Sequence, residues 1–249
     1  MLKTLYYIYF FIIAVPLLLV ATVLASLLTS VGCIIFGGKW WGYYPPKIWA
    51  KLFCILTLVR VKVEGKEKFD KRQSYVFVAN HQGAYDIFAI YGYLGHNFKW
   101  MMKKSLEKIP FVGFACKRAG HILVDNSGAG GVKSTMREAE KMLKGGMSIV
   151  VFPEGSRTKT GKMNRFKRGA FRLAQEFSLP IVPITINGAF DVMPRTSLLP
   201  FCGSITLKIH DAIVAPSDEA DIKNKMAEAY AAVYGGLDDK YKDLEQALK

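Results

Sequence analysis

Residues 75–90 have the sequence Tyr75-Val76-Phe77-Val78-Ala79-Asn80-His81-Gln82-Gly83-Ala84-Tyr85-Asp86-Ile87-Phe88-Ala89-Ile90. The apolar run at the start predicts a buried strand, and the apolar run that begins at Ile87 is typical of a helix. The polar stretch between them lies where a strand gives way to a helix, and loops at such positions commonly carry the chemistry of α/β proteins.

His81 and Asp86, with four residues between them, are the candidate catalytic pair. A carboxylate that holds one ring N–H of an imidazole fixes its tautomer and leaves the other nitrogen free to take a proton. No serine or cysteine lies inside residues 80–86, so the base is expected to act directly on a substrate hydroxyl. The alternative is purely local structure, since acids also favour the first turn of a helix.

Strand-like and helix-like segments alternate through the rest of the chain. The predicted strands are 61–63, 75–79, 99–102, 121–124, 148–152, 181–186 and 204–209, and the predicted helices are 86–94, 132–143, 168–177 and 219–234. This alternation predicts an α/β fold with a mixed, largely parallel sheet flanked by helices. The charged, amphipathic residues 237–248 predict a solvated helix at the end.

The first 59 residues predict a membrane-anchoring helical segment, followed by a catalytic domain at 60–249. The run from Leu5 to Phe36 is almost entirely apolar and exceeds the roughly 20 residues that span a bilayer. It is also too long for a cleaved signal peptide. One tilted span and two shorter helices within one leaflet both fit it, and the apolar stretch from Ile48 to Val59 predicts an interfacial helix beside it.

The chain is strongly basic, with 34 Lys and Arg against 20 Asp and Glu, a formal net charge of +14. Beside a membrane anchor, this charge favours anionic lipid headgroups and phosphorylated substrates as partners over nucleic acid. Cations gather just after the apolar run, which predicts a cytoplasmic position for the domain. Four cysteines without paired spacing predict neither disulfides nor a metal site.

A second loop whose residues could bind a ligand follows the strand that ends at Phe152. It begins Pro153-Glu154-Gly155-Ser156-Arg157, and between Glu154 and Glu176 seven basic residues occur without an acid. Glycine lets the backbone approach a ligand closely, and arginine can bind phosphate through two parallel N–H bonds. The loop therefore predicts an anion site, with a solvated basic loop as the alternative.

Four blocks of sequence resemble the motifs of the glycerolipid acyltransferase family, specifically lysophosphatidic acid acyltransferases of the bacterial type. The pattern Asn-His-x4-Asp matches Asn80, His81 and Asp86, and Lys-x2-Leu-x3-Pro-x2-Gly matches Lys103, Leu106, Pro110 and Gly113. The pattern Phe-Pro-Glu-Gly-x-Arg matches Phe152 to Gly155 and Arg157, and the apolar strand ending in Val-Pro matches Ile181-Val182-Pro183. The blocks occur in the family's order over roughly residues 60–215.

This resemblance implies transfer of an acyl chain from acyl-CoA or acyl carrier protein to the free hydroxyl of lysophosphatidic acid, without a cofactor, at the cytoplasmic face of a bacterial inner membrane. It implies His81 as the general base, oriented by Asp86. It implies that Lys103 and Arg157 bind the acceptor's phosphate, with Glu154 and Gly155 at the same substrate site.

One departure from the pattern bears on the acceptor, because Asn126 stands where the family often has arginine. Other acceptors, such as glycerol-3-phosphate or an amine-containing lyso-lipid, therefore stay open. A non-enzymatic protein that binds anionic membranes is a third hypothesis, but it leaves His81 and Asp86 without a role.

Overall fold

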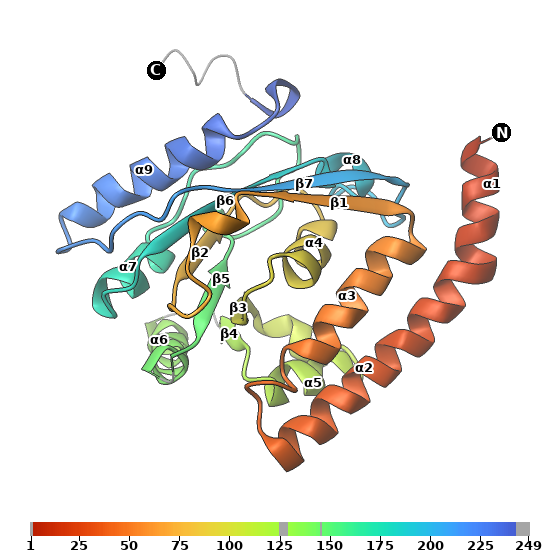
Figure 1. The fold of residues 1–249 in the computed structure, drawn as a ribbon, viewed down its shortest axis with the longest axis horizontal. Coiled ribbons are helices and arrows are strands. Elements are labelled where there is room, and N and C mark those ends of the chain that lie inside the picture. The colour runs from red at the N-terminus through yellow and green to blue at the C-terminus, as the bar shows by residue number, and fades with distance from the viewer. Residues whose placement is uncertain (1, 125–128, 145, 243–249) are drawn as a thin grey trace.

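The computed structural model describes residues 2–124, 129–144 and 146–242. Within these ranges seven strands form one sheet, in the order β1-β7-β6-β2-β5-β3-β4 (Figure 1). They are β1 (Val59–Glu64), β2 (Val76–Ala79), β3 (Phe98–Lys103), β4 (Ile122–Val124), β5 (Ser148–Val151), β6 (Ile181–Asn187) and β7 (Gly203–Ile209). All neighbouring strands pair in parallel except β6 and β7, which are antiparallel. The predicted mixed, largely parallel sheet is therefore confirmed.

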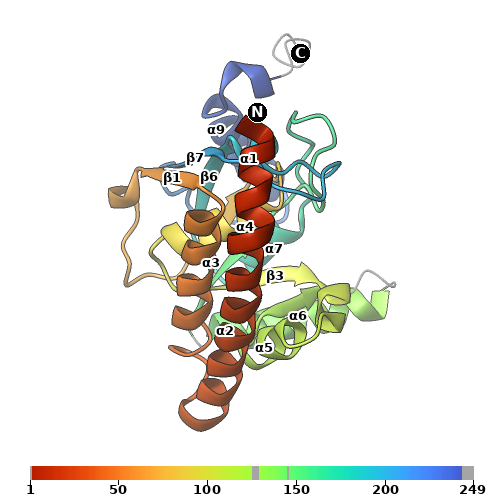
Figure 2. The same ribbon diagram turned by 90° about the vertical axis from the view of Figure 1, so that its right-hand side faces the viewer.

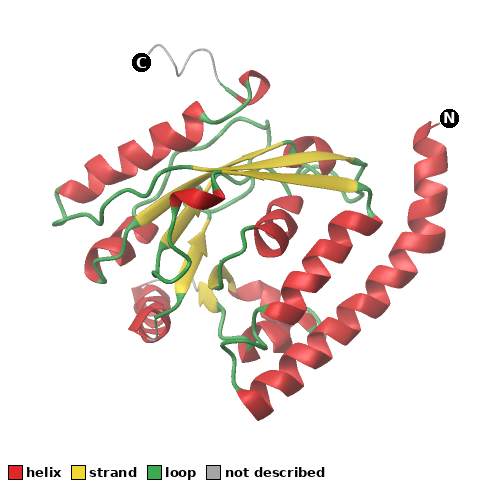
Figure 3. Ribbon diagram, viewed as in Figure 1, coloured by secondary structure: helices red, strands yellow, loops and turns green. Residues whose placement is uncertain are grey.

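Helices cover both faces of this sheet, as Figure 3 shows by its colours. They are α1 (Leu2–Tyr9), α2 (Val15–Phe36), α3 (Tyr44–Leu56), α4 (Tyr85–Tyr93), α5 (Val112–Arg118), α6 (Ala129–Lys144), α7 (Gly169–Glu176), α8 (Ala189–Val192) and α9 (Asp221–Gly235). Shorter 3₁₀ turns occupy Lys66–Lys68, Lys104–Lys108 and Asp239–Tyr241.

Alternation along β2 shows how the two faces are filled. Phe77 and Ala79 pack in a core with α3 and α4, whereas Val76 and Val78 pack in a second core with α6, α7 and α9. All four side chains are fully buried. Strands buried on both faces are apolar at every position, which is why residues 75–79 lack the polar alternation of a surface strand.

The N-terminal segment forms one continuous helix rather than two shorter ones. A π-helical turn, Phe10–Ala14, joins α1 to α2, and the resulting helix Leu2–Phe36 has the length and apolar composition to cross a bilayer. It runs along the side of the molecule next to α3 (Figure 2). The helix α3 begins at Tyr44, earlier than expected, because prolines are accommodated in its first turn.

Three segments differ from the sequence expectation. The short helices α5 and α8 were not predicted. Residues 237–242 were expected to begin a solvated α-helix, but they form the 3₁₀ turn Asp239–Tyr241, and the side chains of Leu237 and Tyr241 are buried. Residues 243–248 of that prediction lie outside the described residues.

Candidate active site

The site lies at the carboxyl edge of the parallel strands, where β2 and β5 are neighbours. His81 follows β2, Asp86 lies in the first turn of α4, and Phe152 follows β5. The parallel pairing of the two strands brings both loops to the same edge, which sequence spacing alone does not specify.

His81 and Asp86 form the expected pair. His81 Nδ1 lies 2.7 Å from Asp86 Oδ2, and the same oxygen accepts a hydrogen bond from the Gly83 backbone N–H at 2.9 Å. The Asp86 side chain is fully buried, while that of His81 retains 15% of its exposure. Because the ionised carboxylate is only an acceptor, His81 carries its proton on Nδ1 and presents Nε2 as the basic nitrogen.

Gly83 is required by close contact with the segment after β6. A Cβ atom at this position would lie 2.5 Å from the Ala189 carbonyl oxygen and 2.6 Å from that of Met193. Gly83 also pairs with Pro194 in an antiparallel bridge. The loop that carries His81 is therefore pressed between β2 and the α8 region, which fixes where Asp86 meets the imidazole.

The second loop is bound directly to the first. His81 donates its backbone N–H to Glu154 Oε1 at 2.7 Å, and Thr158 donates its N–H to the His81 carbonyl at 2.8 Å. The Phe152 ring stacks on the imidazole with centroids 3.9 Å apart and planes 7° apart. The loop of Glu154 thus holds His81 through its backbone on two sides and its ring on one face.

Glu154 has partners within the chain for both carboxylate oxygens. Oε1 accepts from His81, and Oε2 accepts from the backbone and side-chain N–H groups of Asn164, both at 2.8 Å. Sequence reasoning did not single out Asn164, ten residues further on, because no motif or periodicity connects it to Glu154. These contacts favour a positioning role for Glu154 over direct contact with the acceptor.

Burial raises the pKa of the Glu154 carboxyl from 4.5 to about 7, outweighing the hydrogen bonds from Asn164 and His81 that act in the opposite direction. The folded protein therefore holds this proton more tightly than the unfolded chain. The resulting stabilisation is complete below pH 4.5 and is lost as the pH rises through about 7.

This linkage predicts how Glu154→Gln changes stability. Between about pH 5 and about pH 8, the unfolding free energy of the variant relative to wild type is expected to rise by about 2.5 kcal/mol, because the variant has no buried carboxyl to ionise. Denaturant unfolding at both pH values measures the difference. A variant-to-wild-type difference that is the same at the two pH values contradicts the assignment.

The remaining predicted site residues lie around this centre. Gly155 adopts a left-handed φ of 77°, and Lys167 Nζ lies 2.8 Å from the place of its missing Cβ. Arg157 is half-buried and directly precedes Thr158, which bonds to His81. Lys103, the last residue of β3, is exposed, and no ion pair within the described residues joins it to the other five. Asn126 lies outside those residues.

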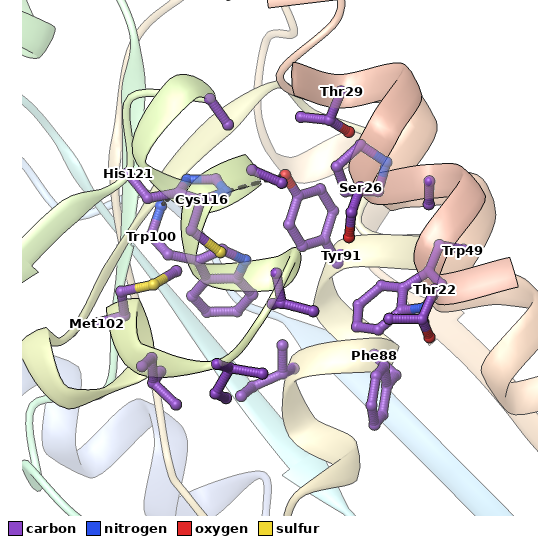
Figure 4. Close-up of a pocket in the computed structure, with 18 residues that line it drawn as sticks. Thr22, Ser26, Thr29, Trp49, Phe88, Tyr91, Trp100, Met102, Cys116 and His121 are labelled. Carbon is purple, nitrogen blue, oxygen red and sulfur yellow. Dashed lines mark hydrogen bonds between the residues drawn. The ribbon is translucent and has the colours of Figure 1, made fainter. Parts of the chain in front are cut away.

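An apolar cavity of about 220 Å³ lies beside the site, between α2, α3, α4, β3 and α5 (Figure 4). Trp100 lines it and stacks on Phe152, with centroids 5.6 Å apart, so two aromatic rings separate the cavity from His81. His121 also lines it, but burial lowers the pKa of this imidazole to about 3, which leaves the side chain neutral at pH 7. The cavity wall therefore suits a hydrocarbon chain.

Comparison with known proteins identifies the family. The acyltransferase family model matches residues 60–187. The chain belongs to the acyltransferase family. The resemblance inferred from the four sequence blocks is thereby confirmed at the level of the family.

Several relatives of this acyltransferase are named as 1-acyl-sn-glycerol-3-phosphate acyltransferases. A chloroplastic enzyme of Brassica napus is 30% identical over 75% of this chain and 55% of its own length. The human alpha enzyme is 38% identical over 53% of this chain and 47% of its own. The Helicobacter pylori enzyme is 29% identical over 74% of this chain and 79% of its own length. This chain thus spans about half the length of the plant and mammalian relatives.

One solved structure matches nearly the whole chain. The crystal structure of the 1-acyl-sn-glycerophosphate (LPA) acyltransferase PlsC from Thermotoga maritima has a TM-score of 0.76 and 26% sequence identity. The match covers 94% of this chain and 93% of that one, so it includes the long N-terminal apolar helix as well as the sheet.

Proposed function

We propose that this protein transfers an acyl chain from a thioester, acyl-CoA or acyl carrier protein, to the free hydroxyl of lysophosphatidic acid, forming phosphatidic acid. The observation that carries the proposal is the 2.7 Å contact between His81 and buried Asp86, set beside a basic loop and an apolar cavity. The names of the plant, mammalian and bacterial relatives support the same reaction.

In the proposed reaction, His81 Nε2 takes the proton of the acceptor hydroxyl as its oxygen attacks the thioester carbonyl. Asp86 stabilises the resulting imidazolium through Nδ1–H. The tetrahedral intermediate then expels the thiolate, which receives the proton from Nε2. One C–O bond forms, one C–S bond breaks, and the imidazole returns to its starting state.

The basic groups are assigned to the acceptor's phosphate. Arg157 lies next to the residue that bonds to His81, and Lys103 ends the strand beside β5. Gly155 lets the acceptor approach the backbone between them. We assign Glu154 to positioning, since both its oxygens hold protein N–H groups.

The apolar cavity is assigned to the acyl chain of the donor. Trp100 in its wall stacks on Phe152, which in turn stacks on His81, so we propose that a chain held there leaves its thioester at the end nearest His81. Burying methylene groups stabilises binding by about 0.8 kcal/mol each.

We propose residues 1–59 as the membrane anchor and 60–249 as the catalytic domain, on the cytoplasmic face of the inner membrane. Large apolar side chains are exposed along α2 and α3, including Leu24, Leu28, Ile48 and Leu52. Yet the helix Leu2–Phe36 contacts the rest of the chain from Tyr6, which donates to the Thr57 carbonyl, as far as the buried end of α2. Along α2 the helix packs against both α3 and α5, so Leu2–Phe36 and α3 form a hairpin, and this favours a segment lying in one leaflet over a lone span.

The proposal is tested by supplying purified protein with lysophosphatidic acid and acyl-CoA or acyl carrier protein and identifying the product by mass spectrometry. Parallel reactions contain glycerol-3-phosphate or an amine-containing lyso-lipid. Phosphatidic acid as the dominant product supports the proposal. A dominant product from another acceptor would show that lysophosphatidic acid is not the preferred acceptor. Absence of transfer from every donor would contradict the proposed reaction.

The Arg157→Gln variant is expected to raise KM for lysophosphatidic acid about 10- to 100-fold while changing kcat little, because it removes a charge-assisted phosphate contact. The Arg172→Gln variant is the matched control, since Arg172, which lies on α7, pairs with Glu219 instead of facing the site. Equal KM values in both variants would exclude Arg157 from phosphate binding.

A further inference from the structure

The turn between Lys104–Lys108 and α5 holds Phe111 in an unfavourable backbone conformation. Its φ is 60° and its ψ is −53°, and the Val112 N–H bonds to the Pro110 carbonyl at 2.6 Å. This is a three-residue γ-turn with positive φ, which is rare and strained for a residue with a bulky side chain. Such strain persists where surrounding structure maintains it.

The strained turn exposes apolar side chains. Ile109, Phe111 and Phe114, which we call the apolar tip, are 44%, 55% and 49% exposed. The Gly113 N–H bonds to the Ile109 carbonyl at 2.8 Å, so the tip is a closed turn. Exposure of an aromatic ring to water does not offset the strain of the turn. Transfer of the ring into an apolar phase is favourable and would offset it.

The apolar tip adjoins both the cavity and the helical anchor. Ile109 and Val112 line the apolar cavity, and α5 packs against α2, which also carries exposed leucines and valines. The tip therefore adjoins the helix whose exposed apolar side chains are already assigned to the bilayer.

Basic residues surround the apolar tip. Lys108 is exposed next to Ile109, and the Arg118 guanidinium lies 5.0 Å from the centre of the Phe114 ring. Lysine and arginine beside inserted apolar groups can extend to the headgroups of anionic lipids. This combination of apolar tip and cationic rim specifies a lipid surface.

We propose that Ile109, Phe111 and Phe114 insert into the bilayer beside the anchor and hold the cavity wall against the lipid. An acyl chain then reaches the cavity without crossing water. The inference rests on the membrane association proposed above and adds to it a contact outside residues 1–59.

Photocrosslinking tests the insertion directly. Phe111→p-benzoylphenylalanine is incorporated into the full chain, which is then bound to vesicles of phosphatidylcholine and phosphatidylglycerol and irradiated. Val214→p-benzoylphenylalanine is the matched control, because Val214 is 74% exposed but follows Ile213, which pairs with the amino end of β6. We expect lipid adducts at least about fivefold more abundant at position 111. Equal adduct yields at the two positions overturn the proposal.

The Phe111→Gly variant separates the tip from the reaction. Glycine adopts this φ without strain, so the melting temperature is expected to stay equal or rise. Transfer to an acceptor presented in vesicles is expected to fall about tenfold, as expected for losing partial burial of one phenyl ring. Transfer to a short-chain acceptor dissolved as monomers is expected to stay unchanged.

Equal losses with vesicle and monomeric acceptors, or no loss with either, contradict the insertion. If the wild-type protein transfers no acyl chain, the proposed reaction is contradicted. The crosslinking result still decides whether the tip contacts the membrane.

Discussion

The His81→Ala variant is expected to transfer acyl chains about 10²- to 10⁴-fold more slowly than wild type, because the acceptor hydroxyl loses its general base. The fold is expected to survive. The backbone bonds of residue 81 to Glu154 and Thr158 do not depend on the side chain, and the imidazole is partly exposed. The truncation removes the stacking on Phe152 and the contact with Asp86, whose Oδ2 still accepts the Gly83 N–H.

Single-turnover transfer from a labelled thioester measures this loss, and thermal unfolding of the same preparation checks the fold. A folded His81→Ala protein that retains turnover within threefold of wild type would exclude His81 as the base.

The Asp86→Asn variant is also expected to lower turnover about 10²- to 10⁴-fold, although asparagine has the same size and shape as aspartate. If the amide nitrogen faces His81, it donates to Nδ1 and moves the ring proton to Nε2, which can no longer accept one. In this orientation the amide nitrogen also faces the Gly83 N–H, so two donors oppose each other and the Gly83 N–H loses its acceptor. If the amide oxygen faces them, both bonds remain, but the negative charge that stabilises the imidazolium is gone.

The Asp211→Asn variant provides the matched control. Asp211 is a surface acid bonded to Lys68, so the same substitution there leaves the His81 pair untouched. Its turnover is expected to stay within twofold of wild type. Comparable losses in Asp86→Asn and Asp211→Asn would mean that the effect is one of stability, and the assignment of Asp86 would fail.

Local patterns were sufficient to predict the strands and the longer helices. Apolar runs such as residues 75–79 are produced by burial on both faces of the sheet, and their short length and β-branched residues favour a strand. The helix α5 was missed because it is short, and because its apolar residues line a cavity instead of forming a regular stripe against the core.

The two catalytic loops were predictable separately, but their contact was not. His81 and Glu154 meet because β2 and β5 are neighbours, and strand order is a long-range property. Asn164 bonds to Glu154 and Phe152 stacks on His81 because of how the loops fold back, which the spacing of residues in the sequence does not predict. The roles assigned to the six predicted site residues stay predictions until the variants are measured.

The pairing of β1 with β7 has a consequence for how the protein is made. The strand β1 lies at the edge of the sheet, and its neighbour β7 begins at Gly203, long after β1 leaves the ribosome. The apolar hairpin of Leu2–Phe36 and α3 emerges before β1 and, under the proposed membrane association, can meet lipid while the sheet is still incomplete. Contacts so distant in sequence form slowly and leave strand edges open in the meantime. If the proposed anchor holds, biogenesis is thus expected to proceed with the nascent chain already bound to the membrane, and the sheet is completed there when β7 pairs with β1.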